Sequence, residues 1–95
     1  MIRKLKLMPY ANAYVVDEEK TVKLYSYTTL VAVVKHTDDD ETFIRCYGLF
    51  SATTRKHISA FAKELGLTFK DFKGVAYENY YFNPATGEIR FDNEI

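Results

Sequence analysis

The chain has 95 residues, 47% of them hydrophobic and 16% aromatic, and its 13 Lys and Arg balance 13 Asp and Glu. This length supports one hydrophobic core rather than two, so we expect a single domain spanning residues 1–95. The apolar content excludes a disordered chain, and the net charge of zero offers no global attraction for a polyanion.

The charges are nevertheless grouped along the chain. Residues 1–35 and 51–75 each carry an excess of cations, whereas residues 36–50 and 76–95 each carry an excess of acids. Such blocks either cancel by packing against one another or form a two-sided surface suited to a protein partner. The sequence leaves both alternatives open.

Cys46 is the only cysteine, so the chain can form no internal disulfide and no thiolate metal site. It lies in a strand-like run, where we expect a buried, inert thiol. No stretch has the continuous apolar length of a signal peptide or of a membrane span. We therefore expect a cytoplasmic protein with no membrane association, no cofactor and no metal.

The first half of the chain has the composition of β-strands. Residues 1–9 nearly alternate between apolar and basic residues, as an edge strand does, until Pro9 interrupts them. Residues 10–16 are β-prone and a polar turn follows at 17–20. The run 21–36 is rich in β-branched and aromatic residues, and its later part, 30–34, is apolar on both faces, which predicts a central strand.

An acidic turn at 37–40 leads into a predicted strand at 41–50, and so short a link favours an antiparallel hairpin. The aspartates of this turn lack the alternating spacing of a calcium loop. We expect them to form a solvated turn rather than a metal site.

Capping chemistry predicts the principal helix, at about 52–65. Ser51 is the expected N-cap, and Gly66 follows the last helical turn as a terminating glycine. Apolar and small residues recur every three or four positions, which predicts a buried face made of Thr54, Ile58, Phe61, Ala62 and Leu65. The predicted solvent face contains Arg55, Lys56, Ser59, Lys63 and Glu64.

After this helix, Thr68 is a predicted N-cap for one short helical turn that ends at Gly74. Residues 75–82 read as an aromatic strand, NPATG at 83–87 as a turn, and 88–91 as the returning strand of a hairpin. The acidic end, 92–95, is expected to fray. Together the pattern predicts an α+β fold, in which an antiparallel sheet of about five strands carries the helix on one face.

The start of the principal helix is the candidate binding site. Arg55 and Lys56 place positive charge in the first turn, where the helix dipole is also positive, and no acid lies close in sequence. Free amides, hydroxyls and cations at a helix start suit an anion. The candidate contact residues are Ser51, Thr53, Thr54, Arg55, Lys56 and His57. An ordinary capped helix with solvated cations explains the same residues, and it is the commoner arrangement for signals of this kind.

The sequence contains few residues suited to catalysis. There are two histidines, His36 and His57, and none of the nucleophile, phosphate-loop or zinc motifs of common enzymes. His57 could pair with Cys46 or with Ser51 as base and nucleophile, but no third member is evident. We expect His57 to pack against the sheet and to bond a main-chain carbonyl, and we expect no enzyme activity.

Two segments carry a resemblance, SYTTLVAVV at 26–34 and LFSATTRKHISAF at 49–61. They resemble a family of small uncharacterised proteins of bacteriophages and mobile elements of Gram-positive bacteria. The matching residues are Ser26, Tyr27, Thr28, Val31, Ala32, Phe50, Ser51, Thr53, Thr54, Lys56, His57 and Ile58. The resemblance implies no catalytic activity and no assigned mechanism, but it implies a setting, that of a phage accessory protein in a bacterial cytoplasm.

These observations favour a non-enzymatic accessory protein that binds a host or phage protein, for example as an inhibitor or modulator of host defence. The alternative is a nucleic-acid-binding protein that uses the basic start of the helix. Exposed strand edges make self-association a further option. A continuous basic face would favour nucleic acid, and a divided face would favour a protein partner.

Overall fold

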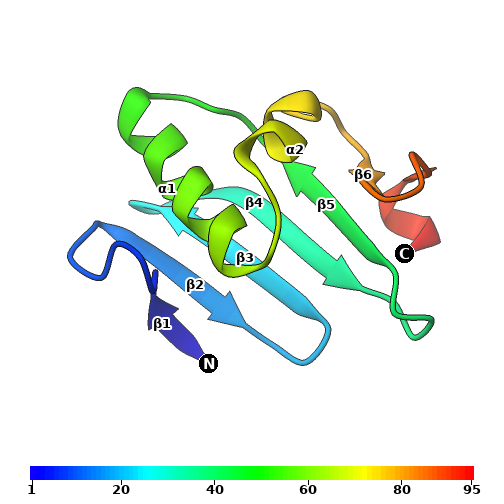
Figure 1. The fold of residues 1–95 in the computed structure, drawn as a ribbon, viewed down its shortest axis with the longest axis horizontal. Helices are drawn as coiled ribbons and strands as arrows, with labels where there is room; N and C mark the ends of the chain where they lie inside the picture. Colours follow the sequence, from blue (N-terminus) through cyan, green and yellow to red (C-terminus); the bar gives the residue numbers. More distant parts are fainter.

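The computed structural model describes residues 1–95 and shows one α+β domain, an open antiparallel sheet with two helices on one face (Figure 1). Its elements are β1 (Ile2–Lys4), β2 (Ala13–Asp17), β3 (Thr21–Ser26), β4 (Thr29–His36), β5 (Thr42–Cys46), α1 (Ala52–Glu64), α2 (Phe69–Gly74), β6 (Tyr81–Phe82), β7 (Ile89–Arg90) and the 3₁₀ turn η1 (Asp92–Glu94). The strand order in the sheet is the order in the chain, β1 to β7.

The fold class is confirmed, with seven strands rather than about five. The difference lies at the edges, where β6 and β7 have only two residues each. Most of the strand expected at 75–82 is irregular, because Ala76 makes only an isolated bridge to Cys46 before β6 begins at Tyr81. The central position of β4 is as predicted, since three strands lie on each side of it.

The run 21–36 is not continuous, because a tight turn at Tyr27 and Thr28 separates β3 from β4. Tyr27 has φ +57° and so takes the left-handed conformation in which glycine or asparagine is usual. The sequence therefore gave no signal for this hairpin. A register shift between Leu24 and Tyr25 accompanies it.

The main core lies between the helices and the sheet. Phe61 of α1 and Phe72 of α2 are fully buried, with ring centroids 5.9 Å apart, and pack over Leu24, Val34 and Ile44 of the central strands. Capping fixes both helices, since Ser51 caps α1 as predicted and Thr68 forms a capping box with Asp71 at the start of α2. The helix stops at Leu65 and Gly66, where Gly66 has φ +74°.

Glu64 lies inside the structure, contrary to its predicted place on the solvent face. Its side chain is 3% exposed, and Glu64 Oε1 lies 2.7 Å from Arg3 Nη2 of β1. The second carboxylate oxygen accepts a hydrogen bond of 2.9 Å from the backbone amide of Lys6. This ion pair joins the edge strand β1 to the end of α1, a contact between residues far apart in sequence.

The opposite side of the sheet carries no helix, and we call it the open face. On its β5 to β7 side a small cluster of Val33, Phe43 and Tyr81 is buried, and Ile95 packs against it. Asp92 of η1 pairs with Arg45 at 3.1 Å between carboxylate oxygen and Nη1. The expectation of a frayed end is therefore wrong, because residues 92–95 fold over this cluster.

Candidate functional site

The start of α1 is built by hydroxyl groups, as predicted. Ser51 Oγ accepts a 3.1 Å hydrogen bond from the backbone amide of Thr54 and donates one of 3.2 Å to Thr54 Oγ1. No acid lies in the first turn, and neither Arg55 nor Lys56 takes part in an ion pair. The two cations therefore remain available to a partner.

A buried polar network lies beneath this first turn. Ser26 Oγ, at the end of β3, is 3.1 Å from Thr54 Oγ1 and 2.8 Å from His57 Nδ1. The hydroxyls can donate in one direction, from Ser51 to Thr54, from Thr54 to Ser26 and from Ser26 to the imidazole. That direction uses Nδ1 as an acceptor, which only neutral histidine provides.

His57 is packed against the sheet as expected, but its partner is the Ser26 hydroxyl rather than a main-chain carbonyl. Its side chain is buried, and its ring lies 5.9 Å from that of Tyr27 between centroids. Burial lowers the pKa of His57 below its usual value, because the charged imidazolium loses its hydration there. The hydrogen-bond network therefore forms when His57 is neutral.

The six candidate residues are thus divided by burial. Thr54 and His57 are buried and hold the first turn onto β3, whereas Ser51, which caps the helix, is exposed, as are Thr53, Arg55 and Lys56. The network also unites the two segments that carry the family resemblance, since Ser26 comes from the first and Ser51, Thr54 and His57 from the second. Only the exposed residues can meet a partner in this conformation.

Two aromatic side chains beside the helix start were not among the predicted site residues. Phe50 and Tyr77 are 56% and 66% exposed, and their rings meet edge to face with centroids 6.1 Å apart. The backbone amide of Phe50 donates to Tyr77 Oη at 3.3 Å. Both residues have positive φ, +51° and +68°. A Cβ at Gly48 would lie 2.5 Å from the Tyr77 ring, so this position needs glycine.

Exposed aromatics gather at one end of the strands. The connections there, 5–12, 27–28, 47–51 and 75–80, lie at the same end because neighbouring strands run antiparallel. They contain Tyr10, Tyr27, Phe50 and Tyr77, which are each at least half exposed. We call these four residues the aromatic end. This grouping cannot be predicted from local sequence, because it depends on the strand order.

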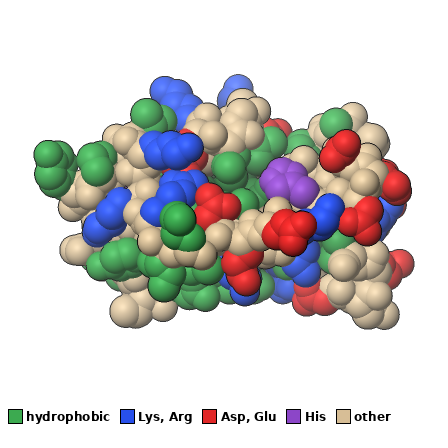
Figure 2. Space-filling view, turned by 90° about the horizontal axis from the view of Figure 1, so that it is seen from below, with side chains coloured by type: hydrophobic (Ala, Val, Ile, Leu, Met, Phe, Trp, Pro, Cys, Tyr) green, Lys and Arg blue, Asp and Glu red, His purple; other side chains and the backbone are tan.

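Acids gather at the opposite end. The turns there, 18–20, 37–41 and 83–88, contain Glu18, Glu19, Asp38, Asp39, Asp40, Glu41 and Glu88. Figure 2 shows the molecule from below, with acidic side chains mainly in its right half and Lys and Arg side chains in both halves. Acidic and basic side chains are therefore mixed on this side of the molecule.

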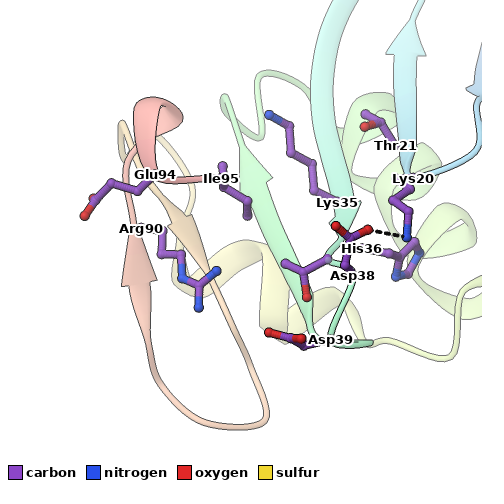
Figure 3. Close-up of a pocket in the computed structure, with 10 residues that line it drawn as sticks. Lys20, Thr21, Lys35, His36, Asp38, Asp39, Arg90, Glu94 and Ile95 are labelled. Carbon is purple, nitrogen blue, oxygen red and sulfur yellow. Dashed lines mark ion pairs between the residues drawn. The ribbon is translucent and has the colours of Figure 1, made fainter.

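A polar hollow of about 440 Å³ lies at the acidic end (Figure 3). Lys20 Nζ and Asp38 Oδ1 pair at 2.9 Å across it, and this hydrogen bond lowers the pKa of Asp38 and raises that of Lys20. His36 Nδ1 is 3.2 Å from Thr42 Oγ1. Both ions of the pair are well exposed. Such an arrangement is typical of solvated turns, and it brings no nucleophile to a base.

The catalytic pairs considered from the sequence do not form. Cys46 is buried and its thiol bonds Gly48 O at 3.7 Å, while Ser51 Oγ bonds Thr54 rather than His57. Burial raises the pKa of the Cys46 thiol to about 11. The Ser26 and His57 pair is closed to solvent and contacts no carboxylate. No group of three His, Cys, Asp or Glu side chains is placed to hold a metal ion.

Together these features define a small α+β meander with a helix start and exposed aromatics at one end of its strands. The chain belongs to a family of unknown function, DUF8033, whose model matches residues 3–79. The match includes both segments of the Ser26 and His57 network and ends before β6. No curated protein and no solved structure matches the chain. None of the helices has the length and apolar character needed to cross a bilayer.

Proposed function

We propose that this protein acts without catalysis by binding another protein at the aromatic end. The observation that carries this proposal is the grouping of Tyr27, Phe50 and Tyr77, which are exposed, large and held on left-handed backbone. Tyr and Phe are enriched at protein interfaces relative to the rest of the surface, and Tyr is enriched among the residues that contribute most to binding.

The backbone supports this assignment. A left-handed conformation at a bulky non-glycine residue costs of order 1 kcal/mol or more, and such residues cluster at ligand-binding positions. Here three of the four non-glycine residues with positive φ are these aromatics. The folded chain keeps them exposed instead of relaxing the backbone and burying the rings, which supports a role for them at the surface.

The charges indicate the character of the partner. Arg55 and Lys56 are exposed beside Phe50 and have no acidic neighbour in an ion pair. A partner surface with apolar sockets and an acidic rim would complement this end. The mixture of acidic and basic side chains in Figure 2, in place of a continuous basic face, also favours a protein over a polyanion as the partner.

The setting is part of the proposal. The two sequence segments resemble proteins of bacteriophages and mobile elements, and a chain of 95 residues suits an accessory factor that modulates a host or phage protein. We propose that it works in the cytoplasm of a bacterial host. The closed Ser26 and His57 pair and the inert Cys46 support a function without catalysis.

Affinity capture from a bacterial host lysate tests the proposal, with nuclease added so that nucleic acid cannot bridge the proteins. The tagged wild type should retain a host or phage protein that the Phe50→Ser/Tyr77→Ser variant loses. Phe91→Ser is the matched control, because Phe91 is also exposed but lies outside the aromatic end. Loss of the captured protein on nuclease treatment, or equal capture by the double variant, would contradict a protein partner at this end.

Self-association is measured in the same series. The edge strands of the sheet are short and unpaired, so the chain could pair with a second copy. Sedimentation of the wild type alone measures whether it forms a dimer. A dimer that the double variant loses would make the partner a second copy of this chain.

A further inference from the structure

The open face of the sheet differs from the rest of the surface in its charge. Residues directly opposite one another on antiparallel strands share a face. One row across the sheet joins Lys4, Tyr14, Tyr25 and Leu30, and the next row includes Lys23 and Arg45 on either side of Val33. No acidic residue occupies a position in these rows.

Cations and aromatic rings are paired on this face. Lys4 Nζ lies 4.4 Å from the centroid of the Tyr14 ring, and Arg45 Cζ lies 4.5 Å from that of Tyr47. Lys35 Nζ lies 4.6 Å from the centroid of the Tyr81 ring. These contacts hold the lysine and arginine heads over the sheet instead of leaving them extended into solvent.

Between the cations lies a shallow apolar hollow of about 510 Å³. It is lined by Ile2, Tyr14, Val16, Tyr25, Tyr27 and Thr28, so three of its walls are tyrosine rings. Lys4 and Lys23 flank it, because each pairs directly across the sheet with a residue that lines the hollow, Tyr14 and Val16. Neither lysine forms an ion pair.

We propose that the open face binds single-stranded nucleic acid, with bases stacked in the hollow and phosphates held by lysines. Tyrosine faces and a positive surface are the two elements that bind an unpaired strand without sequence preference. The stacking positions are Tyr14, Tyr25 and Tyr27, and the phosphate positions are Lys4 and Lys23. Charge complementarity selects this occupant, since the rows contain cations and no acid, although the whole chain is neutral.

The C-terminal residues limit the site to the strands β1 to β4. Ile95 covers the cluster of Val33, Phe43 and Tyr81, and Asp92 neutralises Arg45. A strand bound across β1 to β4 lies on the side of the sheet opposite α1. This surface therefore differs both from the aromatic end, which it shares only at Tyr27, and from the basic start of α1.

Fluorescence anisotropy with labelled oligonucleotides of about 12 nucleotides, single-stranded and duplex, tests the site. At about 50 mM salt the wild type should bind the single strand with a micromolar Kd, more tightly than the duplex, and should weaken steeply as salt rises. Lys4→Ala/Lys23→Ala should weaken binding about tenfold and reduce the log-log salt slope by about 1.4, or about 0.7 for each lysine on a single strand. Tyr14→Leu/Tyr25→Leu, which keeps the apolar area, should also weaken binding about tenfold.

Lys63→Ala/Lys73→Ala is the matched control, because it removes the same number of positive charges from the helix side, where both lysines are exposed and belong to neither proposed surface. It should change Kd less than about twofold. Circular dichroism of each variant shows that the fold is retained. The proposal is overturned if the wild type does not bind at low salt, if duplex binds as tightly, or if the control variant loses binding equally.

Two further outcomes would also overturn it. Competition by poly-glutamate as effective as that by the oligonucleotide would show that the face takes an acidic protein. A wild-type dimer that Tyr14→Leu/Tyr25→Leu dissociates would show that a second copy covers it. Capture of a protein at the aromatic end is measured with nuclease present, so it succeeds or fails independently of this site.

Discussion

Ser26 and His57 stand 31 residues apart in the chain and meet with 2.8 Å between Ser26 Oγ and His57 Nδ1. The contact joins the end of β3 to the second turn of α1 and is closed to solvent. Because Thr54 and Ser51 continue the same network, the start of the helix is fixed to the sheet by hydroxyl groups.

This network makes stability depend on pH. Burial lowers the pKa of His57 in the folded protein, so between the folded and unfolded pKa values the unfolded chain binds more protons. The contribution of neutral His57 is complete above its unfolded pKa of about 6.5 and is lost as pH falls below it. The urea midpoint should therefore be lower at about pH 5.5 than at about pH 7.5, where most carboxylates stay ionised.

The two histidines provide the control for that measurement. His57→Gln should reduce the difference between the two midpoints, whereas His36→Gln should leave it unchanged, because the His36 side chain is exposed at the end of β4. An unchanged difference in His57→Gln would mean that other groups carry the pH dependence.

Phe61 is the side chain on which the packing of α1 depends most. It is fully buried and contacts Phe72 of α2, so Phe61→Ala removes a whole ring from between both helices and the sheet. We expect a loss of about 3 to 5 kcal/mol in the free energy of unfolding, measured by urea titration. The exposed Phe91→Ala should change it little. A loss below about 1 kcal/mol for Phe61→Ala would be inconsistent with this core.

Ser51 provides a smaller test of the helix start. Ser51→Ala removes the acceptor for the Thr54 amide and should cost about 1 kcal/mol in the same titration. Thr53→Ala is the control, since Thr53 is exposed and caps nothing. An equal loss of unfolding free energy in the two variants would show that the Ser51 hydroxyl does not stabilise the start of α1 as its cap.

The Cys46 thiol should be unreactive in the folded protein. It is buried and its pKa is raised to about 11, so almost no thiolate is present at neutral pH. A colorimetric thiol reagent should react fully in denaturing urea and hardly at all in native buffer. A Thr53→Cys variant supplies an exposed thiol for comparison, and rapid native reaction of the wild type would show that β5 opens readily.

The features predicted correctly from the sequence are those encoded locally. The Ser51 cap, the buried positions Thr54, Ile58 and Phe61, and the Thr68 start of α2 each follow from residues within a few positions. The features that were not predicted depend on contacts between residues far apart in the chain, or on backbone conformations that are rare for the residue type. Glu64 has the spacing of a solvent residue, and only the approach of Arg3 from β1 explains its burial.

The candidate site shows the same limit. The exposure of Arg55 and Lys56 and the packing of His57 against the sheet follow from helical spacing, but the hydrogen-bond partner of His57, Ser26, lies in another element. The turn at Tyr27 contains neither glycine nor asparagine, so its residues do not predict a turn. The open face and the aromatic end can be recognised only when the strand order is known, because each combines residues from different parts of the chain.

A sheet whose strand order follows the chain has a consequence for how the protein folds. Each pairing from β1 to β5 closes a loop of two to eight residues, so little chain entropy is lost before the pairing is gained. Contacts of this kind lower the contact order and favour rapid folding. The connection from β5 to β6 is different, because it contains both helices. The β6 to β7 hairpin therefore reaches β5 only across this long connection, and we expect it to join last, during folding and during synthesis on the ribosome alike.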